Sequence, residues 1–325
     1  AEDIVAVRNQ CDRHGVTWYP LPYTRSPPIL STLHDLRRMR RLARRLHRAN
    51  SFDLVHCRSY VAALVGLSMK RRHGTGFLFD MRGFWADERV DGGLWNLGNP
   101  LFRAVFRYFK KQEVNFLQEA DHIVSLTEAA RNLLQERTPA QRLAPISVIP
   151  CCTDFSVFQP VTPASRSRAR AELGIGPDTR VAAYLGSVGT WYLLGEMLDA
   201  FAVQRDRSPT ALMLFVTRDD PDAIRAAAAA RGVPPDSLII RSASRERVPA
   251  LLAAADYGLF FIKPSFSKQA SSPVKLGEMM ALEIPVLTNA GVGDVDRILA
   301  ESSAGVTVKD FTREAYAEAL DTLES

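Results

Sequence analysis

The sequence has few cysteines, and none in the spacing of a metal or redox site. Four occur in 325 residues and no two form a CxxC pair, which argues against structural zinc and thioredoxin-type chemistry. The adjacent Cys151 and Cys152 leave a vicinal disulfide open as an alternative, but we favour small buried thiols in a reducing cytosol.

Long apolar runs and a signal sequence are also missing. No stretch reaches the roughly 18 apolar residues that a membrane-spanning helix needs. The opening residues, Ala1-Glu2-Asp3-Ile4, offer neither the basic nor the apolar region of a signal peptide. With 46% hydrophobic and 24% charged residues and no low-complexity tract, we expect a folded cytoplasmic protein.

The length favours two domains of roughly 150 residues each, since chains longer than ~250–300 residues rarely fold around a single hydrophobic core. Short β-rich segments alternate with helical patterns, as in parallel α/β layers. We predict strands at 53–57, 76–80, 122–126, 146–150, 181–186, 211–216, 238–241, 257–262 and 285–288. Helices are predicted at 62–69, 100–120, 128–137, 193–204, 221–231, 245–255 and 274–282. The segment 151–168 is the predicted connection, between domains 1–155 and 156–325.

One segment is strongly basic. Its arginines are Arg37, Arg38, Arg40, Arg41, Arg44, Arg45 and Arg48. Leucine, methionine and alanine recur between them at three- and four-residue steps, which predicts an amphipathic helix. Two interpretations stay open: a surface helix that solvates its arginines, or a contact with the anionic inner face of the membrane. Nucleic acid is not an expected partner, because no recognised binding motif accompanies the arginines.

Five segments, in order along the chain, carry a family resemblance. They are 120–128 (ADHIVSLTE), 148–158 (VIPCCTDFSVF), 184–189 (YLGSVG), 254–259 (AADYGL) and 272–286 (SPVKLGEMMALEIPV). Together they resemble the retaining family-4, group 1 glycosyltransferases, and the last resembles the capsule and lipopolysaccharide type. The resemblance implies the α/β GT-B fold, in which two Rossmann-like domains face each other across a cleft.

The sequence departs from the family at three places. The donor motif usually has two glutamates eight positions apart, of which Glu278 matches the second while Ala270 stands at the first. The lysine after the first glycine loop is replaced by Trp191-Tyr192-Leu193, so we expect Lys275 to supply that charge. The family's first strand and its closing helices are not evident before Ala1 or after Ser325, so we expect a GT-B fold without them.

The donor side of the implied site has a glycine-rich turn and one helix. The turn contains Gly186, Ser187, Gly189 and Thr190. Backbone N–H groups at such a turn suit a diphosphate, although a plain tight turn has the same composition. We predict that Lys275 neutralises the leaving diphosphate and that Glu278, on the same helical face, accepts hydrogen bonds from the ribose. Both side chains have the alternative of a solvated helix surface.

The loop after strand 76–80 is the implied acceptor side. Arg82 is predicted to contact phosphate or developing charge, and Asp87 or Glu88 to orient the acceptor hydroxyl. A salt-bridge loop between the domains is the alternative. His56, at the end of a strand, either points into the cleft or has a structural role. We name no general base, since the departing phosphate is able to take the proton.

We predict a retaining, metal-independent hexosyltransferase without a cofactor. The acidic pair Asp219-Asp220 follows a strand, but the GT-B pattern needs no metal there. Its donor is expected to be a nucleoside diphosphate sugar. Its acceptor is expected to be a hydroxyl of a lipid-linked or polysaccharide precursor at the membrane. Two alternatives stay open: a nucleotide-sugar epimerase or hydrolase of the same fold, and a non-catalytic binding subunit, which Ala270 would suit.

Overall fold

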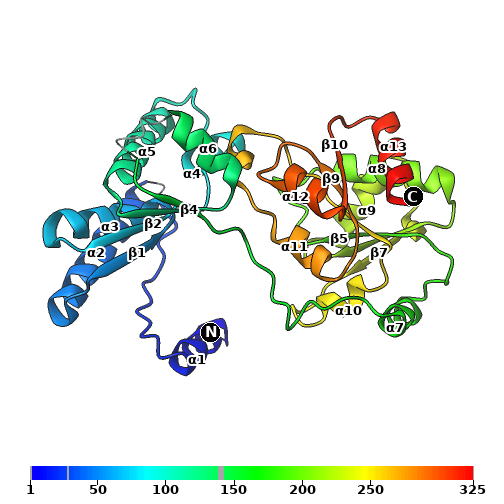
Figure 1. Cartoon of the computed structure of the whole chain (residues 1–325), viewed down its shortest axis with the longest axis horizontal. Coiled ribbons are helices and arrows are strands. Elements are labelled where there is room, and N and C mark those ends of the chain that lie inside the picture. Colours follow the sequence, from blue (N-terminus) through cyan, green and yellow to red (C-terminus); the bar gives the residue numbers. More distant parts are fainter. Residues whose placement is uncertain (1, 28, 138–142, 325) are drawn as a thin grey trace.

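Figure 1 shows the computed structural model, which describes residues 2–27, 29–137 and 143–324. A separate parallel sheet lies toward each end of the elongated molecule, with helices packed around it. Residues 138–142, which follow the predicted helix 128–137 in the sequence, lie outside the description.

The first sheet pairs its described strands in the order β1-β2-β3-β4. They are β1 (Leu54–Arg58), β2 (Gly76–Asp80), β3 (His122–Ser125) and β4 (Ile146–Val148). The helices of this half are α1 (Glu2–Arg13), α2 (Leu30–Asn50), α3 (Ser59–His73), α4 (Trp85–Asp91), α5 (Pro100–Glu119) and α6 (Glu128–Arg137). Aromatic side chains dominate the core beneath the sheet, with Tyr60, Phe77, Phe79 and Phe116 fully buried.

The second sheet, within the same described ranges, has the order β10-β9-β8-β5-β6-β7. Its strands are β5 (Val181–Leu185), β6 (Leu212–Val216), β7 (Leu238–Arg241), β8 (Tyr257–Leu259), β9 (Val286–Asn289) and β10 (Gly305–Val308). Around them lie α7 (Pro163–Leu173), α8 (Leu194–Arg207), α9 (Pro221–Ala229), α10 (Val248–Leu252), α11 (Val274–Ala281), α12 (Val295–Ser302), α13 (Arg313–Glu324) and the 3-10 turns η2 (Pro235–Ser237) and η3 (Phe266–Ala270). The order of strands reverses between β5 and β8, and open α/β sheets bind ligands at the carboxyl ends beside such a reversal.

Local sequence explains where several helices begin. Asn99 accepts a hydrogen bond from Leu101 N at 2.9 Å, and Pro100 occupies the first turn of α5. Thr127 accepts one from Ala130 N at 3.1 Å and starts α6. Thr162 opens α7 with a reciprocal capping box.

Several predicted boundaries were wrong. Helix α7 begins at Pro163, inside the predicted connection, and α4 occupies part of the predicted loop after strand 76–80. Helix α10 covers only Val248–Leu252, because residues 245–247 form a turn closed by Arg247 N and Ser244 O. Strand β8 ends at Leu259, because the chain then leaves the sheet and Ile262 bridges to Tyr192. Besides α4 and α7, the described elements that were not predicted are α1, α12, α13, β10 and the 3-10 turns η2 and η3.

Segment η3 joins the two halves. Its Phe266 ring stacks on Phe84 with centroids 4.9 Å apart, and Ala270 is buried in the core of the first sheet. Asp294 accepts hydrogen bonds from Glu128 N and Ala129 N at 2.8 and 3.0 Å, so a carboxylate of the second half caps helix α6 of the first. The domain boundary at 155/156 stays a prediction. Segment η3 lies after this boundary in the sequence but packs on the first half.

Helix α2 contains the arginine-rich segment and is longer than the run 37–48. It packs on α3 through the buried Leu36, while four arginines at three- to four-residue spacing stay exposed on the other face. These are Arg37, Arg41, Arg45 and Arg48. Among the described helices, none has the length and apolar character to cross a membrane.

Candidate functional site

A pocket of about 620 Å³ lies between the two halves. From the first half it is lined by the loop after β2, by α4 and by Leu126. From the second half it is lined by the glycine loop after β5, by α11 and by the segment 267–273. The pocket therefore lies at the carboxyl end of β5, where the strand order of the second sheet reverses.

Lys275 lies in the first turn of α11 and is only 6% exposed. Its Nζ lies 3.5 Å from the ring centre of Tyr192 and 4.1 Å from that of Tyr184. Within the described part of the chain this ammonium has no hydrogen-bond partner. Burial lowers the pKa of Lys275 from 10.5 to about 7, against an opposing pull from Glu278. A buried, unpaired cation is an unfavourable group in an empty site and a favourable one beside an anion.

Gly186 is the glycine of this loop that lies beside the cation. Its φ of 108° lies in the region that favours glycine, and a Cβ there would lie 3.4 Å from Lys275 Nζ. The glycine loop and Lys275 thus meet in space; that Lys275 supplies the charge missing after this loop stays a prediction.

The rest of the glycine loop is less open to a ligand than predicted. Asp219, in the loop after β6, accepts hydrogen bonds from Ser187 Oγ at 2.9 Å and from Val188 N, and so fixes the glycine loop. Ser187 lines a smaller pocket of about 270 Å³ that shares Gly186 with the main one. Gly189 and Thr190 lie outside the lining of both pockets.

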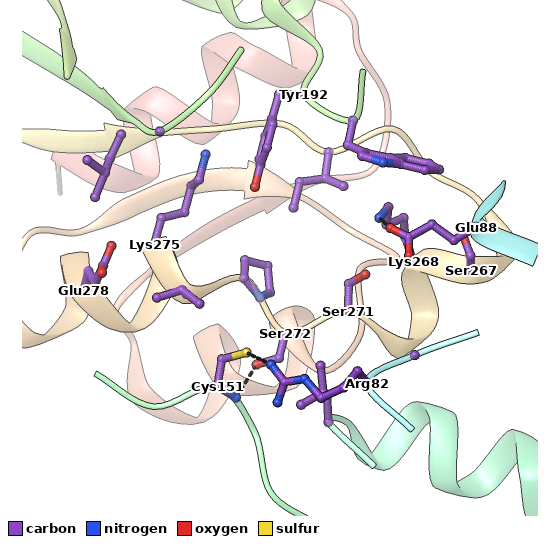
Figure 2. Close-up of a pocket in the computed structure, with 18 of the residues that line it drawn as sticks. Arg82, Glu88, Cys151, Tyr192, Ser267, Lys268, Ser271, Ser272, Lys275 and Glu278 are labelled. Atoms are coloured by element: carbon purple, nitrogen blue, oxygen red, sulfur yellow. Dashed lines mark hydrogen bonds and ion pairs between the residues drawn. The ribbon is translucent and has the colours of Figure 1, made fainter. Parts of the chain in front are cut away.

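Glu278 lies one helical turn after Lys275 and is buried. Its Oε1 accepts a hydrogen bond from Arg245 Nη1 at 2.7 Å, and the Arg245 guanidinium lies over Phe158 at 5.1 Å. The turn that shortens α10 thus positions an arginine against the carboxylate predicted to bind ribose. Figure 2 shows Lys275 and Glu278 entering the same side of the pocket.

The first half contributes Arg82 and Glu88 to the pocket, but not Asp87. Glu88 accepts a hydrogen bond from Lys268 Nζ at 2.8 Å, an ion pair that spans the two halves (Figure 2). Asp87 points instead to Lys110 Nζ at 2.8 Å. Lys110 also binds Glu113 at 2.6 Å, which makes Asp87 part of a network that anchors α4 on α5.

His56 and Ala270 are not part of the pocket lining. His56 Nε2 is 3.6 Å from Asp80 Oδ2, and the imidazole is largely exposed. Ala270 packs near Gly83, whose Cβ position would lie 3.8 Å from Ala270 Cβ. A glutamate at position 270 would therefore place its carboxylate among apolar groups.

Sequence reasoning missed several residues of the pocket wall: Trp191, Arg218, Arg245, Lys268 and Ser271. Trp191 was noted only as a departure from the family, although its ring stacks on Lys268 Nζ at 3.7 Å. The others stand outside the matched motifs, and their signal is spatial.

Cysteines and possible metal ligands give two further outcomes. All four cysteines are free, but the pair is not buried as predicted: Cys151 is half-buried and Cys152 exposed. The connecting segment runs over the surface, which explains the exposure. Among the described residues no cluster of His, Cys, Asp or Glu is arranged to hold a metal ion.

Solved structures define the class of fold. The sucrose-phosphate synthase of Thermosynechococcus elongatus superposes with a TM-score of 0.69 at 17% identity, covering 95% of this chain and 73% of that one. Anabaena HepE, solved in complex with UDP-glucose, gives a TM-score of 0.59 at 14% identity, covering 90% and 72%. Two Rossmann-like domains with a pocket between them are thus the GT-B glycosyltransferase fold, as the resemblance implied.

Family models cover both halves. Residues 3–152 match the glycosyl transferase 4-like domain, and residues 165–325 match the glycosyl transferases group 1. The chain belongs to the group 1 glycosyltransferase family. It is similar to the D-inositol 3-phosphate glycosyltransferase of Mycobacteroides abscessus, with 25% identity over 292 residues, which are 86% of this chain and 60% of the relative. The chain therefore spans about 60% of that relative's length.

Proposed function

We propose that this chain is a retaining glycosyltransferase that moves a hexose from a nucleoside diphosphate donor to a hydroxyl acceptor. The observation that carries the proposal is the buried, unpaired ammonium of Lys275 beside Gly186. A diphosphate placed there would give the cation its missing partner, and its charge grows as the sugar departs. The UDP-glucose complex of Anabaena HepE, which shares the fold, is consistent with such a donor.

The other roles follow from position in the pocket. Glu278, held by Arg245, is proposed to accept hydrogen bonds from the ribose hydroxyls. Glu88 remains a candidate to orient the acceptor hydroxyl once it is released from Lys268. Asp87 is not proposed for that role, because Lys110 holds it away from the pocket.

We also propose that transfer needs no metal ion or other cofactor. Both carboxylates of the acidic pair have structural partners: Asp219 holds the glycine loop, and Asp220 accepts a hydrogen bond from Asp222 N at the start of α9. Charge on the diphosphate would be balanced by side chains, chiefly Lys275.

A nucleotide panel tests the donor site. Thermal unfolding is followed with UDP, GDP, ADP, dTDP and CMP, each with and without magnesium. One nucleoside diphosphate should raise the melting temperature by several degrees, equally with and without magnesium, since a ligand of the native state stabilises it. No shift with any nucleotide would contradict the proposal.

Two variants locate the site. Glu278→Gln should weaken binding of the stabilising nucleotide at least tenfold, because Arg245 loses its charged partner and the ribose hydroxyls lose a carboxylate acceptor. Glu314→Gln, on the exposed face of α13, is the matched control and should leave the affinity within twofold. Equal affinity in Glu278→Gln and Glu314→Gln would move the donor site elsewhere.

For the acceptor we propose a lipid-linked or polysaccharide precursor, reached at the cytoplasmic face of a membrane. The exposed arginine row of α2 suits anionic headgroups, and Leu30 and Leu33 extend the same helix with 63% and 46% exposure. Basic residues flanked by exposed apolar side chains are the pattern of a helix that lies in the membrane interface.

Vesicle sedimentation tests the membrane contact. The protein should pellet with phosphatidylglycerol vesicles and not with phosphatidylcholine vesicles, and added salt should weaken binding. Replacing Arg37, Arg41 and Arg45 by glutamine should lower the bound fraction at least fivefold. The triple variant of Arg168, Arg225 and Arg247 removes the same charge from the second half and serves as control. If both triple variants bound the vesicles equally, the binding would reflect non-specific attraction to the protein's positive charge and not a contact made by α2.

A further inference from the structure

The charges of the pocket do not balance. Its wall contains five cationic side chains, Arg82, Arg218, Arg245, Lys268 and Lys275, and two carboxylates, Glu88 and Glu278. Both carboxylates are already paired, Glu88 with Lys268 and Glu278 with Arg245. In the described part of the chain, the other three cations have no carboxylate partner, so the pocket is built for more than one anionic group.

Two of these three cations line the pocket on the side of Gly186. Lys275 Nζ is beside Gly186, and Arg218, in the loop after β6, lines both the main pocket and the smaller one that also contains Gly186. This pair matches the diphosphate of the proposed donor.

Arg82 lies apart from that pair. It belongs to the loop after β2 in the first half, and Figure 2 shows it beside Cys151 and Ser272, on the opposite side of the pocket from Tyr192 and Lys275. Its guanidinium has one hydrogen bond within the described residues, from Nη2 to Cys151 Sγ at 3.7 Å. A thiol is a weak acceptor, so the remaining N–H donors of the guanidinium are available to a ligand.

The backbone at this position is strained. Arg82 has a φ of 59°, in the left-handed region that non-glycine residues rarely adopt, and Gly83 follows with a φ of 128°. Such strain persists where the surrounding structure fixes it, and it is concentrated at binding sites. The turn directs a long cationic side chain into the pocket.

We infer that Arg82 binds a phosphate group carried by the acceptor. The guanidinium fork matches two oxygens of a phosphate, and Ser272, whose Oγ accepts a hydrogen bond from Cys151 N at 3.1 Å, has its own hydroxyl proton to donate beside it. The acceptor class is then a phosphorylated hydroxyl compound, with Arg82 as the residue that selects it. This inference rests on the proposed transferase function.

Calorimetry with inorganic phosphate tests the inference. Phosphate is titrated, in a buffer free of other oxyanions, into protein saturated with the nucleoside diphosphate found in the panel. Arg82→Gln should weaken phosphate binding at least tenfold while nucleotide affinity stays within twofold. Arg82→Lys should fall between the two, because lysine keeps the charge without the fork. Arg72→Gln, which removes an exposed charge of α3 away from the pocket, should equal the wild type.

The outcomes separate this inference from the donor assignment. Phosphate affinity that is equal in wild type and Arg82→Gln, or absent from both, overturns it. The inference is also overturned if Arg82→Gln leaves phosphate affinity unchanged but lowers the affinity for UDP-glucuronate more than that for UDP-glucose. Arg82 would then bind an anionic group on the donor sugar. If no nucleotide binds, phosphate is titrated into Lys275→Met protein. A tenfold loss on adding Arg82→Gln would retain the phosphate site while the donor assignment falls.

Discussion

Replacing Lys275 by methionine should make the protein more stable and unable to bind its donor. The ammonium is buried without a hydrogen-bond partner among the described residues, and methionine fills a similar volume without a charge. Lowering the pKa from 10.5 to about 7 corresponds to about 5 kcal/mol of destabilisation at about 1.4 kcal/mol per pKa unit. Cation–π contacts with two tyrosine rings offset about 2 kcal/mol of this. A net gain of roughly 3 kcal/mol remains for the variant at low pH.

The gain should depend on pH in a defined direction. Below pH 7 the lysine is protonated in both the folded and the unfolded chain, so the wild type carries the full penalty. Between about pH 7 and 10.5 the unfolded chain binds more protons than the folded one, so wild-type stability rises with pH. The advantage of Lys275→Met should therefore shrink through this window and vanish above it.

Urea unfolding at pH 6 and pH 9 measures the effect. Lys309→Met, which removes an exposed lysine from the same domain, should differ from the wild type by less than ~0.5 kcal/mol at both pH values. A Lys275→Met protein that is no more stable than the wild type at pH 6, or a difference that ignores pH, would refute the assignment of an uncompensated buried cation. Donor binding is read separately, by loss of the nucleotide-induced shift.

Three further substitutions test the supporting structure. Gly186→Ala should lose about 1–2 kcal/mol in urea unfolding, because a Cβ is strained at its φ and meets Lys275; unchanged stability would show that the loop relaxes freely. Asp294→Ala should lose about 1–2 kcal/mol, because the N–H groups of Glu128 and Ala129 lose their acceptor, and should increase protease cleavage between the halves; an unchanged cleavage rate would separate capping from docking. Asp87→Asn should lower stability by weakening the contact with Lys110, while the KM values for nucleotide donor and acceptor stay within twofold. A large loss of kcat would show that Asp87 takes part in the reaction.

Much of the fold was predictable because its signals are local. The strands of both halves are short apolar runs at regular spacing, and caps such as Thr127 mark helix starts within a few residues. Helix α10 was overestimated because its pattern is helical from position 245, whereas Arg245 is used in the tertiary pair with Glu278. Propensity does not report such a competition.

Residues of the pocket were predictable where they lie in a contiguous motif. Lys275 and Glu278 were found together because one helical turn separates them. Lys268 and Arg245 were missed because their carboxylate partners are 180 and 33 positions away in the sequence. The sequence could not distinguish the roles of the adjacent Asp87 and Glu88. Their directions are set by helix α4, which points Asp87 toward Lys110 and Glu88 toward the pocket.

The position of η3 has a consequence for how the molecule opens. This short segment is part of the second domain by sequence, yet Phe266 and Ala270 pack with the first domain. Separating the domains to admit a large acceptor would expose the Phe84–Phe266 stack, at a cost of about 1.5–3 kcal/mol for each ring that reaches water. Because η3 packs on both domains, opening the cleft by a free hinge motion is disfavoured. Substrate entry by sliding of one domain against the other, or by local release of η3, is favoured instead.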